Sequence, residues 1–362
     1  MMFTGMQHTL RKSGMIALLS ISALSLAVTA FAQDATVKPV SPLTPSEDMQ
    51  AVLDQLKAFE APPFYEVVPR IARELPSPAD AVVAVLAERG EPATPEPVAD
   101  IAHRLVPGAE EDILVRIYTP EGTGPFPVIV YIHGGGWVIA NLNTYDSSAR
   151  ALTNAAGAVV VSIAYRQSPE VPFPSPIEDV YAATQWIMQN AAEMNGDPAR
   201  VAIVGESAGG NMATVTTLMA RDRGGLMPIY QVLVYPVTQL TDFDTPSYQE
   251  NAEAAPLSRA GMMWFASLYT PNEADRTNPY VSPLLAKDLS GLPPATIITA
   301  SIDPLRSDGE MYANRLTEAG VAVVYQNYEN VTHEFFGMGA VVDEAKAAVA
   351  LAAEGLRGAF GN

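Results

Sequence analysis

Ser207 is the residue of this sequence best placed to act as a nucleophile. It stands at the centre of a Gly-x-Ser-x-Gly motif that spans residues 205–209. An apolar run, 201–204, precedes the motif, and a helical stretch begins at Asn211. A strand before and a helix after form the context in which such a serine sits on a sharp turn with its hydroxyl exposed. The two glycines are expected because side chains there would collide with the neighbouring strand and helix. A glycine-rich helix start with Ser207 as its N-cap is the simpler alternative.

A serine hydroxyl becomes a good nucleophile only when a base removes its proton, so a histidine is required. The chain has four histidines. His8 lies in a leader described below, His103 precedes the first predicted strand, and His133 directly precedes three glycines. His333 follows the last predicted strand, in a loop that can return to the same edge of the sheet. By elimination we predict that His333 is the base, with a purely structural histidine as the alternative.

The base in turn needs a carboxylate that fixes its tautomer and stabilises the imidazolium form. Asp303 follows the apolar run 295–299 and precedes a helical stretch, which places it at the end of a strand. Asp308 and Glu310 compete for this role, but we expect them in or near the following helix, facing water. The predicted triad is therefore Ser207, Asp303 and His333.

An acyl-transfer site also needs N–H donors aimed at the oxygen that becomes negative. Gly134, Gly135 and Gly136 come just after the apolar run 128–132. Glycines expose backbone N–H groups and permit close approach, and Ala208 supplies the N–H that follows the nucleophile. A phosphate-binding loop is the rival interpretation of the glycine run. It is disfavoured because no Gly-Lys-Ser/Thr follows and a tryptophan takes that place.

Short apolar runs alternate with helical stretches from residue 109 onward. The runs fall at 113–118, 128–132, 159–163, 201–204, 229–235, 295–299 and 321–325. Helical stretches lie between most of them, for example at 177–189, 211–221 and 309–319. Continuous apolar strands that alternate with helices are typical of a largely parallel sheet buried on both faces. We therefore predict an α/β fold in which the ends of the strands carry the chemistry.

The first hundred residues differ from the rest of the chain. Arg11 and Lys12 precede an uncharged run, 15–32, that closes with an Ala-x-Ala sequence. A basic start, an apolar stretch and a small-x-small end are typical of a signal peptide, so we expect residues 1–32 to be cleaved during bacterial export to the periplasm or the medium. A retained membrane anchor is the alternative. Residues 33–104 contain two apolar helical runs between proline-rich breaks, the first after an N-cap at Ser46, and this predicts a helical segment that covers a larger domain.

The composition argues against several classes of function. Forty acidic and 21 basic residues give a formal net charge of −19, which repels phosphate backbones, so no nucleic-acid partner is expected. The sequence has no cysteine, which removes disulfides, thiolate metal sites and cysteine nucleophiles. Serine-based acyl transfer needs no metal or organic cofactor, and we expect none.

Several motifs together resemble the bacterial hormone-sensitive-lipase-like group of α/β hydrolases. They are the His-Gly-Gly-Gly-Trp run at 133–137, the serine motif at 205–210, the Asp-Pro-Leu-Arg run at 303–306, and His333. The resemblance implies an α/β-hydrolase catalytic domain at 105–362, and a helical cap formed by residues 33–104 and an insertion at about 237–285. It also implies the same triad, with the second and third glycines of the run and Ala208 as the oxyanion hole.

Two residues depart from that group's pattern. Glu206 stands where the group usually has aspartate, and Glu334 stands where it usually has glycine. Neither departure removes the nucleophile, the acid or the base. Trp137, Glu206 and Tyr235 are further candidate substrate-binding residues, and Trp137 is expected at the pocket mouth. Some apolar side chains of the insertion are expected to line an acyl pocket.

These inferences predict a serine carboxylic ester hydrolase that forms an acyl-enzyme on Ser207. The expected substrate is a small ester of short to medium chain length, the length being implied by the resemblance. No stable membrane insertion is expected after the leader is cleaved. There are two alternatives. One is an amidase or peptidase on the same fold, and the other is a non-catalytic protein that binds small molecules in the same cleft. A homodimer that pairs through the edge strand 321–325 is a further hypothesis.

Overall fold

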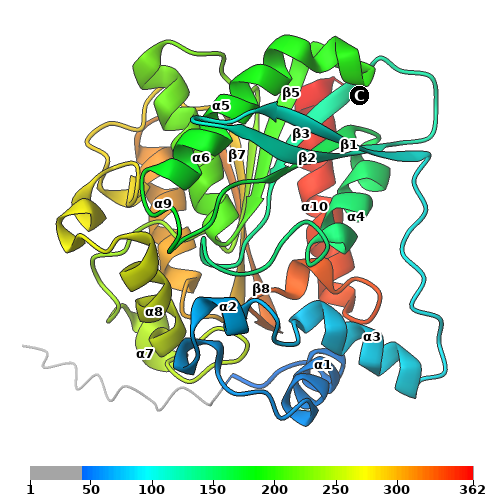
Figure 1. Cartoon of the computed structure of the whole chain (residues 1–362), viewed down its shortest axis with the longest axis vertical. Coiled ribbons are helices and arrows are strands. Elements are labelled where there is room, and N and C mark those ends of the chain that lie inside the picture. Colours follow the sequence, from blue (N-terminus) through cyan, green and yellow to red (C-terminus); the bar gives the residue numbers. More distant parts are fainter. Residues whose placement is uncertain (1–42, 362) are drawn as a thin grey trace, which may run out of the picture. The chain divides into compact units, whose positions relative to one another are not determined.

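The computed structural model describes residues 43–361, which contain one eight-stranded sheet (Figure 1). The spatial order of the strands is β1-β2-β4-β3-β5-β6-β7-β8. The strands are β1 Asp100–Pro107, β2 Asp112–Thr119, β3 Phe126–Ile132, β4 Val159–Ala164, β5 Gly196–Glu206, β6 Gln231–Val234, β7 Ala295–Ile302 and β8 Val323–Thr332. β1 and β2 pair antiparallel with each other, as do β2 and β4, and every other pair is parallel. The predicted signal peptide, 1–32, lies outside the described residues.

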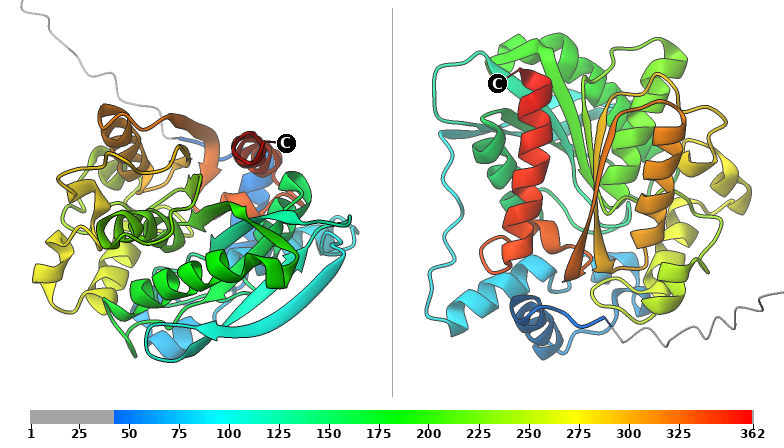
Figure 2. Two further views of the ribbon diagram at one scale, coloured as in Figure 1. Left: turned by 90° about the horizontal axis from the view of Figure 1, so that it is seen from above. Right: turned by 180° about the vertical axis from the view of Figure 1, so that it is seen from behind.

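Helices cover both faces of this sheet. They are α1 Glu47–Ala58, α2 Pro69–Ala72, α3 Pro78–Glu88, α4 Asp146–Ala156, α5 Ser175–Asn190, α6 Ala208–Arg223, α7 Pro246–Glu250, α8 Arg259–Tyr269, α9 Arg306–Glu318 and α10 Asp343–Phe360. Short 3₁₀ turns η1 to η5 lie at Phe64–Glu66, Ala191–Met194, Glu273–Thr277, Pro283–Leu285 and Phe335–Gly337. Figure 2 shows α10 lying along one face of the sheet.

Strand β3 shows how the sequence builds two cores. Val128, Val130 and Ile132 belong to a core shared with α5, α6 and α9, whereas Ile129 and Tyr131 belong to a core shared with α4 and α10. Successive side chains of a strand point to opposite faces, so an unbroken apolar run is what a strand buried on both faces requires. The predicted α/β fold, a mostly parallel sheet flanked by helices, is confirmed.

The sequence prediction missed the first strand. β1 runs antiparallel to β2 along the edge of the sheet, and His103 lies within it rather than before the first strand. The side chain of His103 is exposed and accepts a hydrogen bond from Arg116. An edge strand needs only one apolar face, and β1 buries only Val106, so its pattern lacks a strong strand signal. The predicted domain boundary at 104/105 therefore falls inside a strand, and the sheet begins at Asp100.

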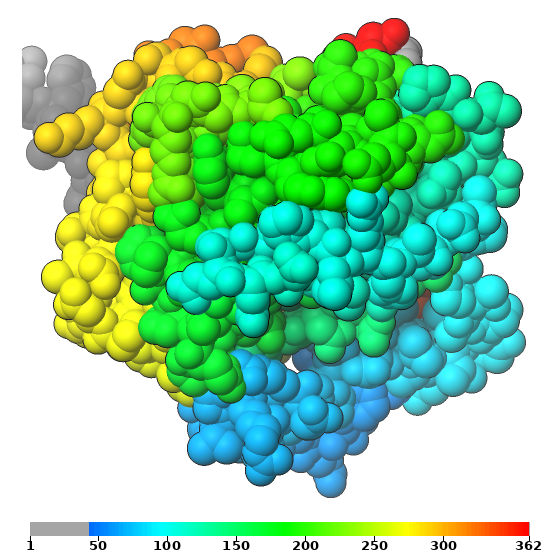
Figure 3. All heavy atoms as spheres, turned by 45° about the horizontal axis from the view of Figure 1, so that its top comes forward, coloured from blue at the N-terminus to red at the C-terminus, as the bar shows by residue number. Residues whose placement is uncertain are grey.

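The N-terminal segment, 43–99, has no sheet of its own and packs on the rest of the chain (Figure 3). The predicted N-cap is confirmed, since the Ser46 hydroxyl accepts from Met49 N–H at 3.4 Å. Arg73, at the end of α2, donates to the carbonyl oxygens of Val138 and Ser168 and forms a bidentate pair with Glu170. These bonds hold α2 against the turn that follows the glycine run and against the loop that follows β4.

The predicted insertion contains α7, α8, η3 and η4. In α8, Phe265 stacks on Phe64 of the N-terminal segment with 4.9 Å between ring centroids. A side chain at Gly136 would collide with the ring of Phe265, so this aromatic pair lies directly against the glycine run. None of the helices within residues 43–361 combines the length and apolarity needed to span a membrane.

Candidate active site

The turn between β5 and α6 presents Ser207. Its backbone angles, φ 56° and ψ −118°, are unusual for a residue with a side chain. Gly205 and Gly209 permit this geometry, because a Cβ at Gly205 would collide with the Gly209 carbonyl and a Cβ at Gly209 with the Ile132 carbonyl. The predicted reason for these two glycines is thus confirmed. Strain of this kind persists where the surrounding structure imposes it, and it concentrates at functional sites.

The structure brings the three predicted triad residues together. His333 Nε2 lies 2.9 Å from Ser207 Oγ, and His333 Nδ1 lies 2.7 Å from Asp303 Oδ2. Both distances are those of hydrogen bonds, so Nδ1–H donates to Asp303 and the serine hydroxyl donates to Nε2 in the neutral state. The three side chains come from the ends of β5, β7 and β8, residues far apart in the sequence. All three are almost completely buried.

The environment of His333 favours its charged form. Burial lowers the pKa of the imidazole, but the charge and hydrogen bond of Asp303, together with two further carboxylates, outweigh it, so the pKa lies above its ordinary value of 6.5. Glu334 and Glu206 act in the same direction by their charges. A ring held in this way is ready to accept a proton from Ser207.

The glycine run and the start of α6 both lie beside the turn that carries Ser207. Gly135 and Gly136 follow β3 with φ +93° and +58°, and Gly134 lies beside the backbone carbonyl of Glu206. Ala208 is the first residue of α6, so its N–H has no partner within the helix. The positive end of the helix dipole therefore points to the position beside Ser207 where a negative oxygen would form.

Comparison with known proteins agrees with this geometry. A family model described as an alpha/beta hydrolase fold matches residues 129–337, more than half of the chain. The esterase LipI of Mycobacterium tuberculosis is 38% identical over 303 residues, covering 80% of this chain and 89% of the relative. The carboxylesterase NlhH of the same organism is 45% identical over 238 residues, covering 65% of this chain and 74% of the relative.

Solved structures give the same result. An α/β hydrolase from the metagenome of Lake Arreo is 38% identical with a TM-score of 0.79, covering 88% of this chain and 99% of that one. A thermostable esterase from Pseudomonas putida is 33% identical with a TM-score of 0.81, covering 89% and 99%.

This chain belongs to the α/β-hydrolase family. The esterase relatives further identify it as a carboxylic ester hydrolase. Within an α/β hydrolase, the carboxyl ends of the parallel strands carry the site, and here those ends hold the predicted triad and glycine run.

Three residues predicted to bind substrate in this α/β hydrolase are enclosed by protein. Trp137 is fully buried and stacks on Tyr269 with 4.2 Å between ring centroids, instead of lying at a pocket mouth. The ring of Tyr235 lies 4.4 Å from that of His333, and its hydroxyl donates to Glu206. Direct contact of Trp137, Glu206 or Tyr235 with substrate stays a prediction. In the structure, Glu206 and Tyr235 contact each other, and Tyr235 contacts His333, whereas Trp137 packs on Tyr269 of α8.

Glu206 and its tyrosine partners form a buried polar group that the sequence reasoning missed. Glu206 accepts hydrogen bonds from Tyr131 and Tyr235. Burial, followed by the charge of Glu334, raises the pKa of Glu206 to about 7. Tyr131 could have been suspected from its place at the end of β3, but nothing in the sequence links it to Glu206. This group supports the turn on which Ser207 sits.

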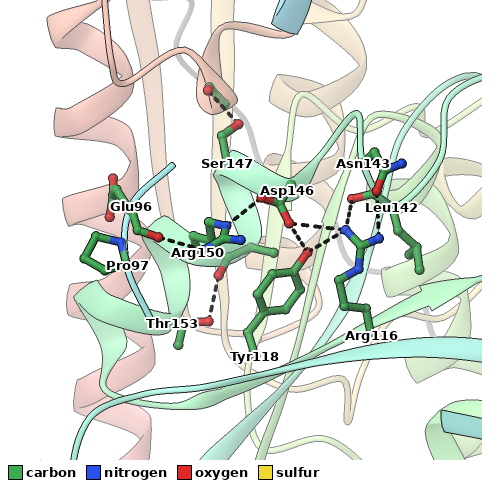
Figure 4. A network of polar contacts seen from close by, with 12 residues as sticks. Glu96, Pro97, Arg116, Tyr118, Leu142, Asn143, Asp146, Ser147, Arg150 and Thr153 are labelled. Carbon is green, nitrogen blue, oxygen red and sulfur yellow. Dashed lines mark hydrogen bonds and ion pairs between the residues drawn. The ribbon is translucent and has the colours of Figure 1, made fainter. Parts of the chain in front are cut away.

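The loop that carries His333 is fixed by the start of α4. Tyr145 donates to Glu334 at 2.6 Å, and Ser147 donates to the carbonyl of Gly337 at 2.9 Å. The start of α4 is itself anchored, because Asp146 binds Arg116, Tyr118 and Arg150 (Figure 4). No local sequence pattern signals these contacts, since they join residues almost two hundred positions apart.

The rejected candidates for acid and base have other partners. Asp308 is fully buried, so the prediction that it faces water is wrong. Its carboxylate accepts hydrogen bonds from the backbone N–H groups of Thr238 and Gln239, and burial raises its pKa to about 7. Glu310 is exposed, as predicted. Burial lowers the pKa of His133 to about 4, and its ring stacks on Tyr165. None of these three contacts the candidate nucleophile through a hydrogen bond in the structure.

Proposed function

We propose that this chain hydrolyses short- to medium-chain carboxylic esters through an acyl-enzyme on Ser207, with His333 as general base and Asp303 as its orienting carboxylate. The observation that carries the proposal is the continuous pair of hydrogen bonds from Ser207 Oγ to His333 Nε2 and from His333 Nδ1 to Asp303. Nucleophile, base and orienting group within hydrogen-bonding reach are the requirement for activating a serine.

In the first step, Ser207 Oγ attacks the ester carbonyl while His333 takes the hydroxyl proton. The carbonyl oxygen becomes negative and is stabilised by the N–H groups of Gly135, Gly136 and Ala208. His333 Nε2 then donates the proton to the departing alcohol, and the acyl group stays on Ser207. In the second step, water replaces Ser207 as the nucleophile activated by His333. Its attack releases the carboxylic acid and restores the serine.

The test is a series of p-nitrophenyl esters from two to sixteen carbons, assayed on the mature protein. We expect kcat/KM to be highest between about two and eight carbons, because Phe265 and Phe64 confine the space beside the glycine run. A maximum at long chains would contradict the proposed length. The matching p-nitroanilides separate an esterase from an amidase, and a fluorophosphonate probe that leaves the protein unlabelled would favour a non-catalytic binding protein.

The pH dependence of the reaction follows from His333. The base must be neutral to accept a proton, and its pKa lies above 6.5 because of Asp303, so activity is lost as the pH falls through that raised value. We expect the acidic limb of kcat/KM to have its midpoint above 6.5. A profile of kcat/KM from pH 5 to 9 checks this, and a limb centred well below 6.5 would contradict the cited effect of Asp303.

We also infer export, on the basis of the predicted signal peptide at 1–32. N-terminal sequencing of the protein from the periplasm or medium of an expressing bacterium would test it. Dimerisation through the edge strand is a further proposal, supported by the place of β8 at the edge of the sheet and the half-exposed side chain of Val324. Light scattering of the purified protein would give its mass in solution.

A further inference from the structure

Glu334, the residue after His333, has a backbone conformation that suits glycine. Its φ is +71°, in the left-handed region that residues with a Cβ adopt at a cost. When a residue with a side chain is kept in a strained backbone conformation beside a reacting group, its side chain is a candidate for a functional role.

The carboxylate faces the nitrogen that transfers the proton. Glu334 Oε1 lies 3.8 Å from His333 Nε2, the ring nitrogen that also contacts Ser207. Tyr145 fixes the carboxylate with a hydrogen bond of 2.6 Å, and the Tyr145 hydroxyl itself lies against Gly134. In ester hydrolysis Nε2 donates its proton to the departing alcohol. Glu334 is therefore on the side of the bond from which the alcohol leaves.

No fixed cation neutralises this carboxylate within the part of the chain that the structure describes. Its one ion pair there is with His333. The small pocket beside it is lined by Glu206, Tyr145, Ser148 and others, with no lysine or arginine among them. Burial raises the pKa of Glu334, and His333 and Tyr145 oppose that shift. The side chain is 19% exposed, so it is partly accessible from solvent.

We propose that Glu334 is a specificity-determining residue, whose carboxylate selects esters of cationic or neutral alcohols and rejects esters of anionic alcohols. A charge on the alcohol comes within a few ångströms of the carboxylate in a partly enclosed site, where water screens it incompletely. A cation is attracted in both the bound state and the transition state, and an anion is repelled in both. The inference rests on the proposed ester hydrolysis by Ser207 and His333.

The experiment compares three acetate esters at pH 8, with hydrolysis followed by proton release. The alcohols are choline, its uncharged isostere 3,3-dimethylbutanol, and 2-hydroxyethanesulfonate. The variant is Glu334→Gln, which keeps the shape of the side chain and its bond to Tyr145 but removes the charge. The matched control is Glu60→Gln, because Glu60 also has a positive φ, +51°, and is exposed. It removes the same charge without touching the site.

We expect Glu334→Gln to lower the ratio of kcat/KM for the choline ester to that for the neutral ester by about three- to ten-fold, and to raise the ratio for the sulfonate ester similarly. Glu60→Gln should leave both ratios unchanged. Unchanged ratios in Glu334→Gln would overturn the inference while the proposed function stands. Failure of the wild-type protein to hydrolyse any of the three esters, or the p-nitrophenyl series, would instead count against the proposed function.

A second variant keeps the inference testable if Glu334→Gln does not fold. Glu334→Gly removes the charge and relieves the strained backbone, but it also removes the hydrogen bond from Tyr145, so thermal unfolding is measured only to verify that the variant is folded. It should show the same loss of charge discrimination as Glu334→Gln. A Glu334→Gly protein that is folded and discriminates as the wild type does would refute the role of the carboxylate.

Discussion

Replacing Ser207 by alanine is expected to abolish ester hydrolysis while leaving the fold intact. The hydroxyl oxygen is the atom that forms the acyl-enzyme. Without it, the only contribution to catalysis that remains is the weak stabilisation of the negative oxygen by the backbone N–H groups. The loss in kcat should be on the order of 10⁴-fold or more. Alanine is smaller than serine and has the same Cβ, so it can adopt the same backbone conformation at φ 56°. The protein should therefore stay folded. The measurement is kcat for p-nitrophenyl butyrate, with circular dichroism to verify the fold.

A matched control is Ser290→Ala, an exposed serine whose hydroxyl contacts only Asp288 in the structure. It should retain wild-type kcat. A fluorophosphonate probe should label the wild type and Ser290→Ala, but not Ser207→Ala. Substantial esterase activity in purified Ser207→Ala would show that another residue is the nucleophile.

Replacing Asp303 by asparagine is expected to reduce kcat by about 10³- to 10⁴-fold with little change in KM. Asparagine has nearly the same shape, but its amide can present an N–H to His333 Nδ1, which favours the tautomer whose Nε2 carries the proton. That tautomer cannot accept the proton of Ser207. Because Asp303 also raises the pKa of His333, the acidic limb of the remaining activity should move to lower pH.

Asp308→Asn separates this effect from the general cost of altering a buried carboxylate. Asp308 is fully buried and lies five positions from Asp303, but it binds the backbone of Thr238 and Gln239 and does not contact His333. We expect Asp308→Asn to keep most of kcat and to change mainly the stability, measured by thermal unfolding. Equal losses of kcat in the two variants would contradict the assignment of Asp303.

The prediction of the site depended on local signals of high specificity. The turn at Ser207 requires glycines because the neighbouring backbone comes within contact distance. The nucleophile is therefore recognisable from a motif of a few adjacent residues. His333 was reached by elimination, which was possible because the chain has only four histidines. The strands of the sheet were visible because burial on both faces requires unbroken apolar runs.

The missed features share a different physical origin. The edge strand β1 was missed because edge strands need few apolar residues. Asp308 was expected to face water, but a buried carboxylate can be satisfied by backbone N–H groups that are distant in the sequence. The enclosure of Trp137 depends on Tyr269, which lies in an insertion more than a hundred residues away. Contacts between residues so distant in the sequence produce no recognisable local sequence pattern.

The α/β architecture and the identities of the residues that carry the chemistry could be predicted from the amino-acid sequence, because backbone turns and buried strands constrain neighbouring residues directly. The hydrogen-bond partners of Glu206 and Glu334 and the anchoring of the His333 loop to α4 became visible only in the folded protein. Those contacts arise when segments distant in sequence pack together, and many residue types could fill each position. The chemistry of this hydrolase is therefore encoded locally, whereas the electrostatic environment around it is a product of folding.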